Sequence, residues 1–119
     1  MLTALADTGN VLVDPISHSP VIVAELEALK GLFDYSTRVS LGSENLQDGL
    51  GIMAERGFRT RLIPFCSVGE GEGMMVGFIP DRAAVRQGSG LRLMENCVVG
   101  VYPHRLSPDK SYDALYNPN

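Results

Sequence analysis

The chain has 119 residues, enough for one domain with a hydrophobic core and too few for two. Its formal net charge of −4 and the lack of a long Lys/Arg cluster exclude the charged surface typical of nucleic-acid binders, so nucleic acid is not an expected partner. No signal peptide opens the chain and no apolar run approaches the roughly 20 residues that cross a bilayer, so the chain as given is expected to be soluble.

The first half of the chain predicts short strands, a hairpin and one helix. The strands are expected at residues 2–6, 11–13, 20–23 and 35–41. Asp14-Pro15-Ile16-Ser17 has the residue types of a turn, which predicts a hairpin between the second and third strands. Apolar residues at helical spacing predict an amphipathic helix over 24–33. Residues 42–51 indicate a polar loop, and 52–57 carry no clear signal.

The second half is strand-rich. Strands are expected at residues 59–68, 74–79, 83–86, 91–94 and 97–102, the last of them apolar enough to be buried on both faces. Gly69, Gly71 and Gly73 separate the first two and predict a mobile hairpin tip, either an ordinary loop or a flap that closes over bound peptide. Ser107-Pro108-Asp109 has the order of a helix start, which predicts a short second helix through Leu115.

The cysteines and histidines do not indicate a metal site. Cys66 and Cys97 lack the paired spacing of zinc or redox motifs and are expected to be small apolar core residues. His18 and His104 each lie near a proline in an expected loop, and nothing supplies the remaining ligands of a coordination shell. No metal or organic cofactor is predicted.

One short motif suggests chemistry. Asp7-Thr8-Gly9-Asn10 follows the apolar run 2–6, an arrangement that presents a carboxylate at the end of a strand, where it can transfer protons. The same residue types are common in turns, so the motif could simply join two strands. Asp-Thr-Gly after apolar residues resembles the active-site motif of aspartic peptidases, in which two such loops meet. This chain has one copy, so the second would come from another chain in a two-fold dimer.

A narrower resemblance runs along the whole chain, to the sporulation sigma-E factor-processing peptidases. The matching pieces are Asp7 to Asn10, Leu12, Asp14-Pro15, 20–23, 61–65, 73–78, Pro80-Asp81, Val99-Gly100, Leu106-Ser107, 112–115 and Pro118. The resemblance implies a mainly β, retropepsin-like closed barrel with two short helices, forming one lobe of a two-fold dimer.

The resemblance also implies an activity and its residues. Asp7 would be the catalytic acid, with Thr8, Gly9 and Asn10 completing the active-site loop and Val99-Gly100 supporting it. The enzyme would be an aspartic endopeptidase that removes the N-terminal pro-segment from a sigma-factor precursor. Residues 1–119 would be a single peptidase domain excised from a longer protein of the cell membrane, facing the mother-cell cytoplasm and possibly lacking its first strand. An activating signal protein from the forespore would act through the missing membrane domain.

Two alternatives remain open at this stage. The domain could be a non-catalytic peptide-binding or interaction module on the same barrel, with Asp7 a turn residue. It could also be an inactive monomer when separated from a missing strand or membrane domain. Incubation with a sigma-factor precursor separates them, because binding without cleavage favours the module.

Overall fold

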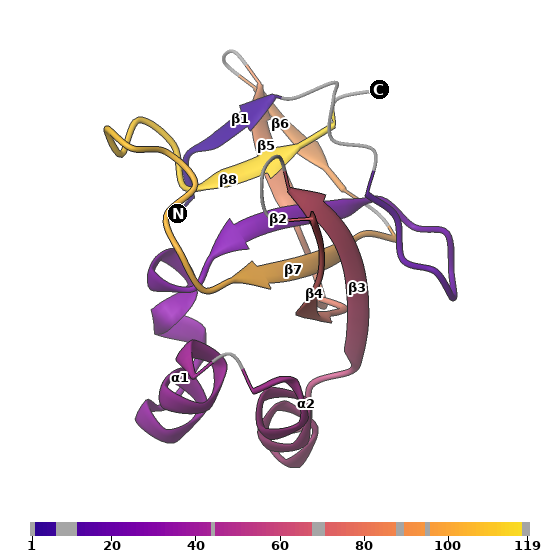
Figure 1. Ribbon diagram of the computed structural model, residues 1–119. Coiled ribbons are helices and arrows are strands. Elements are labelled where there is room, and N and C mark those ends of the chain that lie inside the picture. The colour runs from indigo at the N-terminus through magenta and orange to yellow at the C-terminus, as the bar shows by residue number, and fades with distance from the viewer. Residues whose placement is uncertain are drawn as a thin grey trace.

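A six-stranded mixed sheet with helices packed against it makes up most of the molecule (Figure 1). The computed structural model describes residues 2–6, 12–43, 45–67, 71–87, 90–94 and 96–117. The sheet order is β1 (Ala4–Ala6), β8 (Ala114–Tyr116), β2 (Val21–Glu25), β7 (Val98–Tyr102), β4 (Gly71–Phe78) and β3 (Thr60–Ser67). A separate sheet pairs β5 (Ala84–Gln87) with β6 (Gly90–Leu93). The helical elements are a 3-10 helix, η1 (Glu27–Leu32), and two α-helices, α1 (Tyr35–Gly42) and α2 (Leu46–Glu55).

The centre of the sheet is the parallel pair of β2 and β7, in which Val21 aligns with Val98 and Glu25 with Tyr102. The first four residues of each strand are buried, because both faces of the sheet are covered at this point. The expected burial of residues 97–102 on both faces is therefore confirmed. The strands expected at 2–6, 20–23, 59–68, 74–79, 83–86 and 91–94 are confirmed as well, with small differences at their ends.

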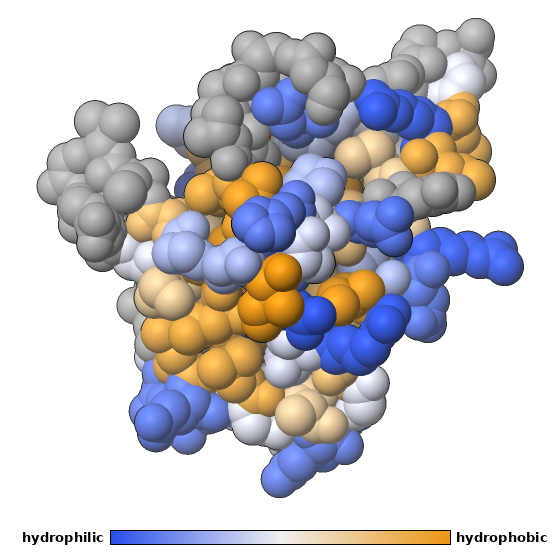
Figure 2. All heavy atoms as spheres, turned by 90° about the vertical axis from the view of Figure 1, so that its right-hand side faces the viewer, coloured by the Kyte–Doolittle hydropathy of each residue, from blue (hydrophilic) through white to orange (hydrophobic). Residues whose placement is uncertain are grey.

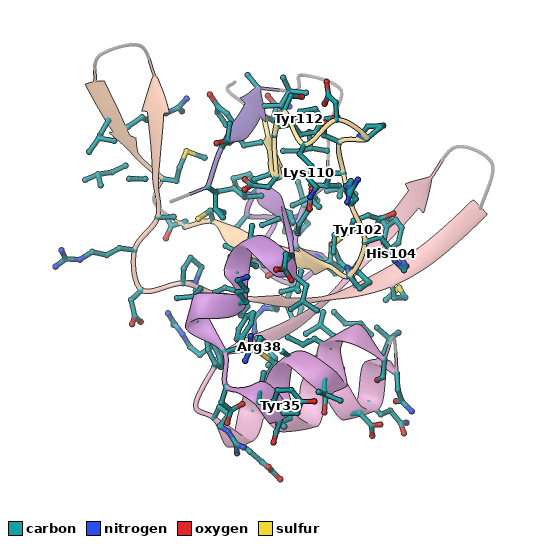
Figure 3. The ribbon with its side chains drawn as sticks, turned by 90° about the vertical axis from the view of Figure 1, so that its left-hand side faces the viewer. Tyr35, Arg38, Tyr102, His104, Lys110 and Tyr112 are labelled. Atoms are coloured by element: carbon teal, nitrogen blue, oxygen red, sulfur yellow. The ribbon has the colours of Figure 1, made fainter. Side chains whose placement is uncertain are left out.

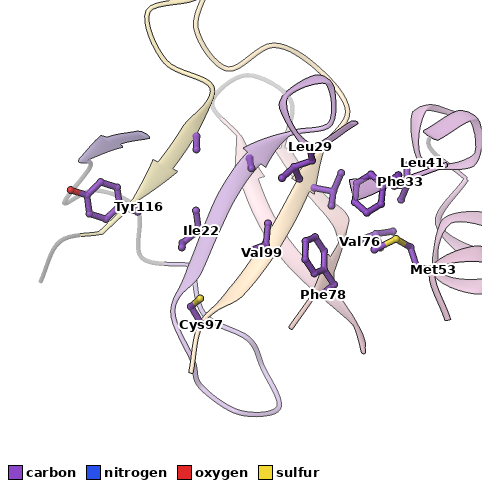
Figure 4. Packing of buried hydrophobic residues seen from close by; sticks show 13 residues of the cluster. Ile22, Leu29, Phe33, Leu41, Met53, Val76, Phe78, Cys97, Val99 and Tyr116 are labelled. Atoms are coloured by element: carbon purple, nitrogen blue, oxygen red, sulfur yellow. The ribbon is translucent and has the colours of Figure 1, made fainter. Parts of the chain in front are cut away.

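The larger core lies between the sheet and the helical elements (Figure 4). Ile22, Val76, Val99 and Val101 come from the sheet, and Leu29, Leu41 and Met53 come from the helical side. Phe33, Phe58 and Phe78 pack edge to face, with ring centroids 5.4 to 6.0 Å apart. This arrangement stabilises aromatic pairs beyond their buried area.

Residues 35–41 and 42–51 were expected as a strand and a loop, and both expectations are wrong. Asp34 caps α1 by accepting a hydrogen bond from the Thr37 N–H at 2.9 Å. Asn45 caps α2 by accepting one from the Asp48 N–H at 3.2 Å. A Cβ at Gly49 would lie 3.2 Å from side-chain atoms of both Leu41 and Val76, so glycine lets α2 approach the sheet closely.

The two expected helices are also corrected. In 24–33, strand β2 continues to Glu25, and only Glu27–Leu32 is helical, as η1. In 107–115 no helix forms, because Lys110 has a left-handed φ of 60° and Ser107 Oγ donates to Asp109 Oδ1 at 2.6 Å. Residues 114–116 pair instead with β1 and β2 as β8.

The expected closed barrel is wrong as well. Across the described residues β1 pairs only with β8, and β3 pairs only with β4, so these two strands are the edges of an open sheet. Strand β1 has three residues, two of them exposed, which is too short an edge to close a barrel. The fold is mainly β, and the hairpins β3–β4 and β5–β6 project from opposite sides of the body (Figure 3).

Candidate functional site

The structure fixes both ends of the segment that carries the Asp-Thr-Gly motif. Asp7, Thr8, Gly9 and Asn10 lie outside the described residues. Strand β1 ends at Ala6, which aligns with Tyr116 of β8. The described chain resumes at Leu12, whose carbonyl accepts a hydrogen bond from the Val21 N–H at 3.1 Å.

Residues 12–20, here called the exit arm, form the expected hairpin. Val13 and Pro20 make an antiparallel bridge, and the Asp14 N–H donates to the Ser19 carbonyl at 2.9 Å. The turn lies at residues 15–17, as predicted. Figure 2 shows the side of the molecule that carries the exit arm and β3, where apolar residues lie among charged ones. The exit arm thus leads directly from the motif into the central strand β2.

Asp14 is a buried carboxylate on the exit arm, and its exposed fraction is 0%. Its Oδ1 accepts from the Ile16 N–H at 3.2 Å, and its Oδ2 accepts from Ser17 Oγ at 2.7 Å and from Arg61 Nε at 2.9 Å. Burial by itself raises the pKa of Asp14, but the hydrogen bonds from Ser17, the Ile16 N–H and Arg61 outweigh it and lower the pKa below 3.8. The Asp14 side chain is therefore ionised at neutral pH and pairs with Arg61.

Sequence reasoning gave Asp14 and Arg61 no role in the site. Both stood in matching pieces of the family resemblance, but 47 positions separate them in the chain. An Asp before proline is typical of a turn, and an Arg in a strand is typical of an exposed face. No local sequence signal indicated the pair, because the two residues meet only when the fold brings β3 beside the exit arm.

Val99 and Gly100 occupy the central strand β7, and their side-chain positions face opposite sides of the sheet. Val99 belongs to the large core beneath the helices. A Cβ at Gly100 would lie 2.5 Å from Met75 Sδ and 3.3 Å from Val21 Cγ1, on the other side. That side holds a second core cluster, in which Val98 and Ile63 are buried and Leu12, the first described residue after the motif, packs against them. Support of the motif by Val99 and Gly100 stays a prediction.

The expected glycine-rich hairpin joins β3 and β4. The two strands pair from Thr60 and Phe78 to Ser67 and Gly71, and Gly69 lies outside the described residues. A Cβ at Gly73 would be 2.8 Å from Phe65 Cζ, so glycine there allows the phenylalanine ring to lie across the hairpin. The hairpin is confirmed, and its use as a flap stays a prediction.

A cavity of about 210 Å³ lies between this hairpin, the two α-helices and the end of β7. Its lining includes Phe65, Met74, Tyr102 and His104. The Tyr102 ring packs edge to face on Phe65 and on His104, with centroids 6.3 and 5.6 Å apart, and the last two residues lie side by side in Figure 3. His104 is exposed, as expected for a loop residue.

The cysteine and metal expectations can be compared only with the described side chains. Cys97 is buried, as expected, and burial raises the pKa of its thiol. The side chain of Cys66 lies outside the described set. Within the described part of the chain, no three His, Cys, Asp or Glu side chains come together as a metal-binding group.

The fold and the anchored motif define a mainly β domain that carries one Asp-Thr-Gly segment between an edge strand and the core. A family model described as "Sporulation factor SpoIIGA", of the Peptidase U4 type, matches residues 1–119. The chain belongs to this family.

Two curated relatives carry the name sporulation sigma-E factor-processing peptidase. The relative from Bacillus subtilis is 25% identical over 121 residues, and the relative from Priestia megaterium is 29% identical over 122 residues. These alignments cover 96% and 98% of this chain but 38% of each relative, so the chain spans well under half the length of the proteins it matches. No solved structure gives a significant match. None of the helices within the described ranges is long and apolar enough to cross a membrane.

Proposed function

We propose that this chain is the catalytic domain of an aspartic endopeptidase, with Asp7 as the catalytic acid. The observation that carries the proposal is the single Asp-Thr-Gly-Asn segment, anchored at Ala6 and Leu12, in a chain whose family and named relatives are peptidases. Thr8, Gly9 and Asn10 complete the loop. Loops held by a rigid scaffold are the usual position of catalytic side chains.

The proposed chemistry needs two carboxylates and no metal. Two Asp side chains about 3 Å apart cannot both ionise, so the pair holds one proton near neutral pH, as in aspartic peptidases generally. The ionised Asp takes a proton from the shared water while that water attacks the scissile carbonyl, and the protonated Asp donates to the carbonyl oxygen. The Asp that took the water proton then gives it to the leaving amine as the peptide bond breaks, and the other Asp takes back a proton from a hydroxyl of the intermediate, which restores the pair.

The second carboxylate would come from a second copy of the chain. One chain carries one motif, and a two-fold dimer is the simplest closed assembly that brings two identical loops together. The Thr8 hydroxyl would donate across the two-fold axis, and Gly9 would let the backbone N–H approach a carboxylate. The open sheet would then be one lobe of a retropepsin-like enzyme, with the β3–β4 hairpin as its flap.

The proposed substrate is the precursor of a sporulation sigma factor, from which the N-terminal pro-segment is removed. The support is the printed name of both relatives. Because the chain spans 38% of each relative, we also propose that the remainder anchors the full-length protein in the cell membrane and receives the forespore signal. The domain itself would lie in the mother-cell cytoplasm.

The proposal is tested with Asp7→Asn in the full-length protein, produced together with a sigma-factor precursor. We expect cleavage to fall below detection, because an amide cannot act as the base toward water, while the thermal unfolding midpoint stays near wild type. Asp48→Asn is the matched control, since it makes the same change on the exposed face of α2. Retained cleavage by Asp7→Asn rejects the aspartic mechanism. Precursor binding without cleavage by the wild type would support a non-catalytic module.

A further inference from the structure

We propose that Arg61 and Asp14 are positioning residues, which fix the exit arm against β3 and thereby hold the Asp7 loop where cleavage requires it. This inference rests on the proposed peptidase function and goes beyond it. Neither residue would touch the substrate. Both would act through the chain that leads out of the catalytic loop.

The Asp14 carboxylate connects the exit arm to itself and to β3. Oδ1 and Oδ2 accept from Ile16 and Ser17 within the arm, at 3.2 and 2.7 Å. Oδ2 also accepts from Arg61 Nε at 2.9 Å, and Arg61 Nη1 donates to the Thr60 carbonyl at 3.0 Å. Because both ends of this network are held by backbone groups, it sets the direction of the arm as well as its distance from β3.

The pair joins segments that the backbone ladders leave apart. The exit arm continues into β2, and in the sheet order β7 and β4 stand between β2 and β3. Ile63 of β3 nevertheless packs with Val21 and Val23 of β2 in the second core cluster, so β3 curls over the face of the sheet. Apolar packing of this kind holds two surfaces together without fixing their direction, whereas a charge-assisted hydrogen bond does fix it.

The burial of the pair argues for a role in geometry more than in stability. The Asp14 side chain is 0% exposed and the Arg61 side chain is 24% exposed. Removing two charges from water costs free energy that their attraction offsets only in part, so such a pair adds little net stability over an uncharged replacement. The desolvation cost lowers the net stability that the pair contributes, but it does not weaken the geometric constraint that the pair places on the exit arm.

A small displacement of the exit arm would also displace the proposed catalytic loop, because the two are adjacent in the chain. Leu12 is five residues from Asp7 and two from Asp14, and its carbonyl bonds to the Val21 N–H at the start of β2. A shift of about 1 Å in a catalytic group can lower the rate roughly 100-fold. Loosening of the arm is therefore expected to lower kcat while substrate binding elsewhere is kept.

The test is Arg61→Met in the purified full-length protein, with a sigma-factor precursor as substrate. We expect kcat to fall roughly 10- to 100-fold with KM changed less than about twofold. Arg61→Lys keeps the charge and is expected to recover part of kcat. Arg56→Met is the matched control, because it breaks the exposed Arg56–Asp34 pair at 2.9 Å and is expected to leave kcat unchanged.

A double variant separates positioning from stability. In Asp14→Asn with Arg61→Met, no buried charge is left unpaired. The Asn Oδ1 can still accept from the Ile16 N–H, and the Asn side-chain amide can donate to Ser17 Oγ in place of the bond that Ser17 gave to the carboxylate. We expect its unfolding midpoint to recover toward wild type while kcat stays as low as in Arg61→Met. Recovery of kcat together with the midpoint, or a wild-type kcat in Arg61→Met, would overturn the positioning role.

Asp7→Asn in the same assay keeps the two proposals distinguishable. If it is inactive while Arg61→Met cleaves at the wild-type rate, the peptidase proposal stands and the positioning role fails. If Asp7→Asn still cleaves, the peptidase proposal fails, and the role assigned to Arg61 and Asp14 fails with it.

Discussion

At the scale of single residues, the buried carboxylate of Asp14 makes the stability of the fold depend on pH. Its pKa is lowered by hydrogen bonds that exist only in the folded chain. A lowered pKa contributes stability that is fully present above the ordinary Asp value of 3.8 and is lost as pH falls through the folded value. Asp109, whose pKa is lowered to about 2 by Ser107 and Ser111, acts in the same direction.

Asp14→Asn should therefore flatten the acid side of the stability profile. We expect the difference in unfolding free energy between wild type and variant to be largest above about pH 4 and to shrink as the pH falls below that value, because only the wild-type residue loses its charge. Urea unfolding at a series of pH values measures this difference. A difference that stays constant with pH would show that the ionised form of Asp14 is not favoured by folding.

At the scale of elements, two glycines face each other where β4 and β7 pair. Gly77 aligns with Gly100, and a Cβ on Gly77 would lie 3.1 Å from Ile63 Cγ1 and 3.1 Å from the Val99 carbonyl oxygen. The absence of side chains at these two positions makes room for Met75 and Ile63 in the second core cluster. The packing of the second core cluster, which Leu12 contacts, therefore depends on glycine at positions 77 and 100.

Gly100→Ala tests this packing. We expect it to lower the unfolding free energy by about 1–3 kcal/mol, because the buried Met75 must move to admit the methyl group. Gly51→Ala is the control: nothing lies within 4 Å of its Cβ position in α2, and alanine should raise helix stability by roughly 0.5–1 kcal/mol. Both are measured by chemical unfolding. A neutral Gly100→Ala would show that the cluster has spare room.

Some of the strands and helices could be predicted from the sequence, and others could not. Strands β2 and β7 were predictable because their β-branched runs are buried on both faces, and the β3–β4 hairpin because glycines separate two apolar runs. Helix α1 was expected as a strand because Tyr35, Thr37 and Val39 are residue types that favour strands. Helix α2 was expected as a loop because Gly42, Gly49 and Gly51 resemble loop residues. Gly49 in fact packs closely against Leu41 and against Val76 of the sheet, and only the caps Asp34 and Asn45 indicated helices locally.

At the scale of the whole molecule, the open sheet gives the site its arrangement. The edge strand β1 leads into the motif, the exit arm leads back to the centre, and β3 curls over to reach Asp14. Asp7 could be proposed from the sequence because its motif consists of residues adjacent in the chain, and its catalytic role stays a prediction. The partner of Asp14 could not be proposed in this way, because it depends on 47 intervening residues folding first.

Two identical chains are proposed to share one pair of carboxylates, and mixing wild-type and Asp7→Asn chains tests this sharing most directly. If each dimer needs both Asp7 residues, randomly assembled equal mixtures should keep about a quarter of the wild-type cleavage rate at constant total protein. Co-produced, differently tagged full-length chains and a sigma-factor precursor provide the assay, with Asp48→Asn mixtures as the control. A rate of about half that of wild type, proportional to the wild-type fraction, would mean that each chain acts alone and would contradict the shared pair.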